Sequence, residues 1–151
     1  MPNYSGSFTA KVTSQSFLGL SEHGPGQSYQ QLVLTQITGP QQSADPMWND
    51  AQLTYWSVAD LMNGSGHQEG YWVNQHADGD RDWGTFEGRV ISHVSQVYTE
   101  GTFKTTGGTG KFAGITGTGT YKGTFSSPTE LHGSWAGSYQ LGAAIAAGGN
   151  A

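Results

Sequence analysis

Cysteine is missing from all 151 residues of the chain. Its absence excludes a disulfide framework, a thiol nucleophile and a thiolate metal site. Charge is also scarce, because Asp, Glu, Lys and Arg make up only 11% of the residues. Six Lys and Arg stand against eleven Asp and Glu, which gives a formal net charge of -5. This balance argues against a nucleic-acid partner, since phosphate binding needs a basic face.

Long apolar runs are missing as well. No stretch approaches the roughly 20 apolar residues of a membrane-spanning helix. The first segment, "MPNYSGSFTAKV", is polar and has no apolar region of the kind found in signal peptides. From these features we expect no membrane partner and a cytoplasmic protein.

Glycine and aromatic residues are abundant instead. The chain has 24 Gly, together with five Trp, seven Tyr and six Phe. This composition predicts a β-rich protein with tight turns, because aromatic side chains favour strands and glycine favours turns. A disordered chain would also be rich in Gly and Ser, but it would be poor in aromatics.

Alternation of apolar and polar residues with a period of two recurs along the chain, and no long helical period appears. Turn-forming segments such as "NGSG" and "ADGDR" separate the alternating runs. We therefore predict one all-β domain over residues 1–141, a closed eight-stranded antiparallel barrel of the calycin kind. Residues 142–151 are expected to be a short helix or disordered. The expected strands are 5–17, 28–38, 51–62, 67–78, 82–92, 97–106, 115–126 and 130–141.

The last hairpin has the clearest register. If Phe125 lies opposite Leu131, then Tyr121 lies opposite Trp135, and aromatics and glycines share one face. Glycine opposite a large ring suits a tightly curved sheet.

The central hairpins have a less regular pattern. Turns at "NGSG" and "DGDR" predict one face that combines apolar and polar residues, with three cross-strand pairs: Trp72 with Glu87, Asn74 with Thr85, and His76 with Trp83. Mixed faces favour a barrel with polar groups in its cavity and an apolar, oligomer-forming outside. A register error of one residue would exchange the two faces.

Residues 107–121, "GGTGKFAGITGTGTY", resemble a segment shared by the allene oxide cyclase and dirigent barrels and by related bacterial proteins. In that superfamily such a loop joins strands six and seven, as it would here. "EGTFKTTGGTGKFAG" and "EGYWVNQHADGDRDWGTFEG" are also similar to the bacterial members. The resemblance implies an eight-stranded barrel with an apolar pocket, chemistry without a cofactor, and association into dimers or trimers.

The resemblance does not extend to the catalytic residues of either group. The cyclases use a Glu, Asn and Cys constellation near their first strands, whereas residues 1–40 here contain Glu22 as the only acid and no Cys. The catalytic acids of dirigent proteins have no clear counterpart either. The glycine run also fails as a phosphate loop, because Phe112 follows Lys111 and a strand, not a helix, comes next.

The candidate active site is therefore predicted from the residues themselves. His76 would act as the base or acid, with Glu87 as its partner or second acid, and Asn74, Tyr55 or Thr85 as the donor to an oxyanion. The expected ligand-binding residues are Trp72, Trp83, Trp48, Thr85 and Leu53.

This arrangement predicts an isomerase, cyclase or lyase that needs no cofactor and acts by acid–base chemistry. Its ligand would be a small hydrophobic or aromatic molecule inside the barrel, and the chain would form a dimer or trimer. The alternative function is a non-catalytic, lipocalin-like binding protein, which needs only a pocket of suitable shape with apolar walls. The polar residues around His76 could also form a solvent-exposed face, with Trp72 and Trp83 serving packing or an interface.

Three weaker patterns complete the sequence picture. The carboxylates in "DGDRD" have the spacing of calcium ligands, but Asp-Gly is an ordinary hairpin turn. His23, His67 and His93 are expected at one barrel end, with Glu69 nearby, although their spacing matches no short metal motif, and no metal site is predicted. The loop "GPQQSADPMWND" has the length of a lid over the other end, or is simply a long connection.

Overall fold

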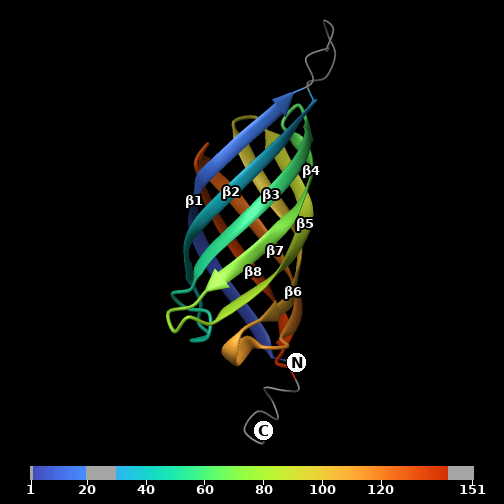
Figure 1. Ribbon diagram of the computed structural model, residues 1–151. Coiled ribbons are helices and arrows are strands. Elements are labelled where there is room, and N and C mark those ends of the chain that lie inside the picture. Colours follow the sequence, from blue (N-terminus) through green and yellow to red (C-terminus); the bar gives the residue numbers. More distant parts are fainter. Residues whose placement is uncertain (1, 20–29, 143–151) are drawn as a thin grey trace, which may run out of the picture.

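Each strand pairs with the next strand in the chain, and the first strand closes the ring by pairing with the last (Figure 1). The computed structural model describes residues 2–19 and 30–142. All pairs of neighbouring strands are antiparallel, which confirms the predicted closed eight-stranded barrel. The strands are β1 (Asn3–Gly19), β2 (Gln30–Gln42), β3 (Gln52–Met62), β4 (Ser65–Gln75), β5 (Arg81–His93), β6 (Gln96–Gly108), β7 (Thr116–Ser127) and β8 (Glu130–Gln140).

Helix is almost absent from the described residues. One 3₁₀ turn, η1 (Gly110–Phe112), forms within the glycine-rich connection between β6 and β7. Among the residues that the structure describes, no helix is long and apolar enough to cross a membrane. His23 and the tail residues 143–151 lie outside the described part of the chain.

The last hairpin has the register predicted from its sequence. Tyr121 lies opposite Trp135, and Phe125 lies opposite Leu131. The side chains of these four residues point into the barrel, and the glycines between them leave room for the rings. Gly119 shows why a larger residue would not fit, because an added Cβ would lie 2.5 Å from the Phe103 ring.

The predicted register of β4 against β5 is wrong. Asn74 lies opposite Asp82, and Trp72 lies opposite Gly84. The reason is the turn, in which the His76 amide donates to the Asp80 carbonyl at 2.9 Å. The turn therefore closes between residues 76 and 80, which brings Asp82 inside.

Because of this register, the two faces of β5 are exchanged relative to the prediction from the sequence. Asp82, Phe86 and Val90 are buried inside the barrel. Trp83 and Glu87, which alternate with them, face outward and are exposed. The apolar pair Phe86 and Val90 explains which face turns inward, because that face removes more apolar surface from water.

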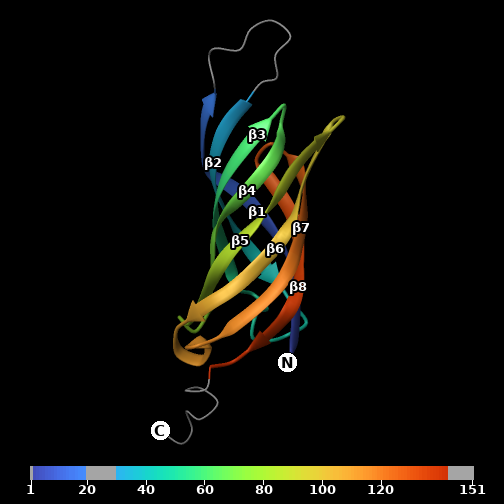
Figure 2. The same ribbon diagram turned by 90° about the vertical axis from the view of Figure 1, so that its right-hand side faces the viewer.

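The connections gather at two barrel ends (Figure 2). We call the first the Trp48 end, where residues 43–51, 76–80 and 109–115 join strands β2 to β3, β4 to β5 and β6 to β7. We call the second the Val94 end, where the tight β3–β4, β5–β6 and β7–β8 turns lie. β1 begins and β8 ends at the Trp48 end.

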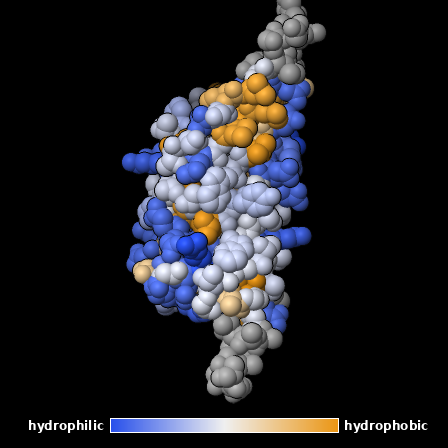
Figure 3. Space-filling view, viewed as in Figure 1, coloured by the Kyte–Doolittle hydropathy of each residue, from blue (hydrophilic) through white to orange (hydrophobic). Residues whose placement is uncertain are grey.

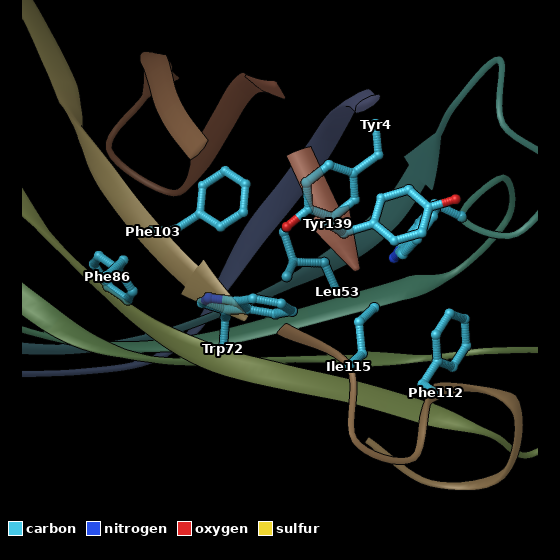
Figure 4. Close-up of a cluster of buried hydrophobic side chains, with 9 residues drawn as sticks. Tyr4, Leu53, Trp72, Phe86, Phe103, Phe112, Ile115 and Tyr139 are labelled. Carbon is cyan, nitrogen blue, oxygen red and sulfur yellow. The ribbon is translucent and has the colours of Figure 1, made fainter. Parts of the chain in front are cut away.

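The core is aromatic toward the Trp48 end (Figure 4). The buried cluster there combines Tyr4, Leu53, Trp72, Phe86, Phe103, Phe112, Ile115 and Tyr139 with Trp48. A smaller aliphatic cluster of Val33, Ala59, Leu61 and Val90 fills the opposite part of the barrel. Most residues of the aromatic cluster also line the candidate site that is described below.

Apolar side chains also gather on the outer face (Figure 3). Leu18 on β1 lies opposite Leu32 on β2, and Leu34 on β2 lies opposite Val58 on β3. All four are exposed. The outside of the barrel is therefore apolar over part of β1, β2 and β3.

Candidate ligand site inside the barrel

A cavity of about 80 Å³ lies inside the barrel. Its walls are mainly aromatic, with five polar side chains among them. The aromatic residues are Tyr4, Phe8, Trp48, Tyr55, Trp72, Phe86, Phe103, Tyr121 and Trp135, and the polar residues are Gln41, Gln68, Asn74, Asp82 and Thr99. An apolar chamber with a few polar groups is the usual form of a small-molecule site.

The Asp82 carboxylate lies at the Trp48 end of the cavity and has no exposed surface. Its Oδ2 atom accepts hydrogen bonds from Trp48 Nε1 at 3.1 Å and Asn74 Nδ2 at 3.2 Å. Its Oδ1 atom accepts one from His76 Nε2 at 2.6 Å. These three donors compensate for the loss of water around a buried carboxylate.

The hydrogen-bond network continues across the barrel. Gln41 Nε2 donates to Asn74 Oδ1, and Trp135 Nε1 donates to Gln41 Oε1 at 2.5 Å. Side chains from β2, β4, β5 and β8 are thereby linked to Trp48 in the β2–β3 connection. We call Gln41, Trp48, Asn74, His76, Asp82 and Trp135 the Asp82 network.

His76 lies behind the cavity wall, not in it. The imidazole is buried and stacks on the Phe112 ring, with ring centroids 4.5 Å apart. The cavity-lining residues do not include His76. Its contact with Asp82 therefore orients the carboxylate, and the ring is not placed to exchange a proton with a ligand in the cavity.

A second polar group lies deeper in the barrel, on the side of the Val94 end. Gln68 Nε2 donates to Tyr121 Oη at 2.7 Å. Burial raises the pKa of Tyr121 to about 12, and the Gln68 hydrogen bond partly offsets this increase. Burial also raises the pKa of Tyr55 well above its usual range, with a smaller contribution from Tyr121.

The structure brings together most of the residues predicted for the site. Asn74, Tyr55, Trp72, Trp48 and Leu53 all line the cavity, and His76 adjoins it through Asp82. Trp83, Thr85 and Glu87 do not join them, because they lie on the outer face of β5. There, Glu87 lies near His67 and Glu69, and all three are exposed.

Several residues that line the cavity were missed by the sequence reasoning. Asp82 is spaced four residues from Phe86 and eight from Val90, and Gln41 is spaced four residues from Ile37 and eight from Val33. Because residues an even number apart share one face of a strand, this spacing indicates that each polar residue faces inward with its apolar neighbours.

The carboxylates of "DGDRD" have three different surroundings. Asp78 Oδ2 lies 2.6 Å from Lys111 Nζ, and Asp80 Oδ2 accepts from the Lys111 amide at 3.2 Å. The Lys111 side chain lowers the pKa of Asp78. Asp82 points the other way, into the barrel. Lys111 thus ties the β4–β5 turn to the glycine-rich connection.

The fold is an antiparallel eight-stranded barrel with an internal, mainly aromatic cavity. Comparison with protein-family models, curated proteins and solved structures gave no match to this chain.

Proposed function

We propose that the chain binds a small, mainly apolar organic molecule inside the barrel. The observation that carries this proposal is the aromatic cavity of about 80 Å³, in which isolated polar groups face apolar walls. Pockets for drug-sized molecules are several times larger, at roughly 300–1,000 Å³. The ligand is therefore about the size of one ring.

The positions of His76 and Asp82 favour binding over the predicted His-based catalysis. His76 is separated from the cavity, and both oxygens of Asp82 already accept hydrogen bonds. A buried carboxylate with these partners stabilises the arrangement of the Trp48 end. The lipocalin-like alternative is thus the function that the geometry supports best.

The test is direct binding of cyclohexene, measured by calorimetry and by ligand-observed NMR. Leu53→Phe adds volume inside the cavity, whereas Leu34→Phe makes the same change on the exposed face of β2. We expect the wild type and Leu34→Phe to bind cyclohexene, and Leu53→Phe to lose binding. Thr99→Leu, which fills the cavity from β6, repeats the test if Leu53→Phe does not fold. No binding by the wild type, or unchanged binding in folded filled variants, would contradict the proposal.

A second candidate is a cofactor-independent isomerase, cyclase or lyase, and a specific observation favours it. Asp82, Asn74 and the phenols of Tyr55 and Tyr121 all line the same cavity. In this proposal Asp82 takes a proton from a carbon beside a carbonyl and returns it at another carbon, while neutral donors hold the charge on oxygen.

Proton exchange tests the catalytic candidate without knowledge of the substrate. Cyclohexanone in heavy water should exchange its α-protons faster with the wild type than in buffer. Asp82→Asn should lower the rate, and Glu87→Gln should leave it unchanged. A wild-type rate equal to that of buffer alone would reject this chemistry and leave the binding proposal intact.

The resemblance of residues 107–121 to the allene oxide cyclase and dirigent barrels supports the same kind of internal site. We also propose that the chain forms a homo-oligomer, a dimer or trimer, through the outer apolar face around Leu32, Leu34 and Val58. Light scattering of the wild type and of Leu34→Glu tests this, and a monomeric wild type would contradict it.

A further inference from the structure

Two tyrosines occupy the deeper part of the cavity. Tyr55 extends from β3 and Tyr121 from β7, and both contact the ring of Phe86 edge-on. The Phe86 centroid lies 5.4 Å from that of Tyr55 and 5.6 Å from that of Tyr121. Phenols from opposite parts of the barrel thus meet around one aromatic ring.

The hydroxyl protons of these tyrosines have no acceptor among the described residues. Tyr121 Oη accepts a hydrogen bond from Gln68 Nε2, and no described group accepts its own proton. Tyr55 Oη makes no hydrogen bond to any residue that the structure describes. Tyr4, at the Trp48 end, is different, because its hydroxyl is hydrogen bonded to Thr105 Oγ1 at 2.8 Å.

A donor without a partner inside a protein reduces stability, so its presence needs a reason. Both phenols line the cavity. A phenol is protonated at neutral pH, so both groups are hydrogen-bond donors there. An acceptor on a molecule in the cavity would satisfy both.

The charge of the cavity restricts that molecule further. Among the described lining residues there is no Lys or Arg, and Asp82 is the only one with a carboxylate. A carboxylate or phosphate on the ligand would lose its water without gaining a cation. An acceptor on a ligand in this cavity is therefore expected to be uncharged.

We propose that the cavity takes an uncharged carbonyl compound about one ring in size, whose oxygen accepts hydrogen bonds from Tyr55 and Tyr121. The inference rests on the proposed function, because it names the chemistry of the ligand for the same cavity. It gives Tyr55 and Tyr121 a binding role that is independent of whether Asp82 acts as a base.

Three probes that share one six-membered ring test the proposal: cyclohexene, cyclohex-2-enone and cyclohex-1-enecarboxylate. With the wild type we expect the enone to bind roughly 5-fold to 10-fold more tightly than cyclohexene, as for one or two hydrogen bonds. The carboxylate should not bind measurably. The infrared C=O band of the bound enone should lie at lower frequency than that of the enone in an apolar solvent.

Single-atom variants separate the hydrogen bonds from packing. Tyr55→Phe and Tyr121→Phe should each lower the ratio of enone affinity to cyclohexene affinity roughly 5-fold and shift the bound C=O band to higher frequency. Tyr139→Phe is the matched control, because Tyr139 is buried but does not line the cavity. It should change neither affinity nor band position.

The outcomes distinguish this inference from the proposed function. If cyclohexene binds and the enone binds no more tightly, with an unshifted C=O band, the carbonyl proposal is wrong and the binding cavity stands. Tight binding of the carboxylate also overturns it. If no probe binds the wild type, the proposed function fails, and this inference fails with it.

Discussion

His76 Nε2 lies 2.6 Å from Asp82 Oδ1, and both side chains are almost completely buried. The pair joins the first residue of the β4–β5 connection to the second residue of β5. The other Asp82 oxygen binds Trp48 and Asn74. At the Trp48 end, a single buried carboxylate therefore accepts hydrogen bonds from three donors in separate parts of the chain.

Replacing His76 should lower the free energy of unfolding, because its hydrogen bond to Asp82 is lost. His76→Phe keeps a ring against Phe112 but leaves the buried Asp82 without one donor, at an expected cost of about 3 kcal/mol in the free energy of unfolding. His132→Phe is the control, because His132 lies 2.9 Å from Glu130 and is about half exposed. That change should cost less than about 1 kcal/mol. Urea denaturation measures both, and equal costs would contradict the assigned importance of the buried pair.

Trp48 and Trp83 permit the same substitution inside and outside the barrel. Trp48→Phe removes the hydrogen bond to Asp82 and should lower the free energy of unfolding by about 2 kcal/mol. It should also change cyclohexene affinity, since Trp48 lines the cavity. Trp83→Phe, on the outer face, should leave binding unchanged. A loss of binding in Trp83→Phe alone would mean that the ligand binds outside the barrel.

Tyr4 and Tyr55 should respond in opposite directions to removal of the hydroxyl. Tyr4→Phe loses the hydrogen bond to Thr105 and should lower the free energy of unfolding by about 1 kcal/mol. Tyr55→Phe removes an unpartnered donor and should raise it by up to about 1 kcal/mol in the absence of ligand. Thermal unfolding measures both, and destabilisation by Tyr55→Phe would show that its hydroxyl already has a partner.

Alkaline pH should unfold the protein through its buried tyrosines. Burial raises the pKa of Tyr4 and of Tyr121 from 10.0 to about 12. Because the unfolded phenols ionise first, stability is complete below pH 10 and falls as the pH rises toward 12. Absorbance at the tyrosinate band, compared among the wild type, Tyr4→Phe and Tyr121→Phe, follows each group. Ionisation of either residue in the folded protein near pH 10 would refute the expected burial effect.

Val94 has an unfavourable backbone conformation in the β5–β6 turn, with φ at 56°, and its side chain is 91% exposed. A β-branched residue is strained in this region, whereas Asn tolerates it. Val94→Asn should therefore raise the free energy of unfolding by about 1 kcal/mol. The reverse substitution, Asn63→Val, lies in the β3–β4 turn, where the φ of residue 63 is 55°. It should lower the free energy of unfolding by a similar amount. Urea denaturation of the two variants checks the pair, and a fall in stability for Val94→Asn would be the contrary result.

The predicted site residues that line the cavity lie mostly on strands with a consistent pattern. Leu53, Tyr55, Trp72 and Asn74 alternate with residues that face outward, and "NG" at 63–64 predicts the tight turn that aligns their strands. The side-chain period of two is a local property, so it is readable from the residues themselves. The same holds for Tyr121 opposite Trp135 in the last hairpin.

Glu87 and Asp82 are the residues whose inward or outward orientation could not be predicted from neighbouring residues alone. The β4–β5 loop closes between His76 and Asp80, which shifts the expected pairing and exchanges the faces of β5. The choice between the faces depends on how much apolar surface each can bury against the other seven strands. That comparison requires the closed barrel.

The sequence by itself determined the all-β class, the eight strands and most turns, because alternation and turn chemistry act over a few neighbouring residues. The tertiary structure alone decided that Asp82 enters the interior, that His76 lies behind it, and that Tyr55 and Tyr121 meet around Phe86. These side chains come from different strands and meet only when β1 pairs with β8 and the sheet closes. Their polar groups then share one small volume without bulk water, which gives the cavity its chemistry.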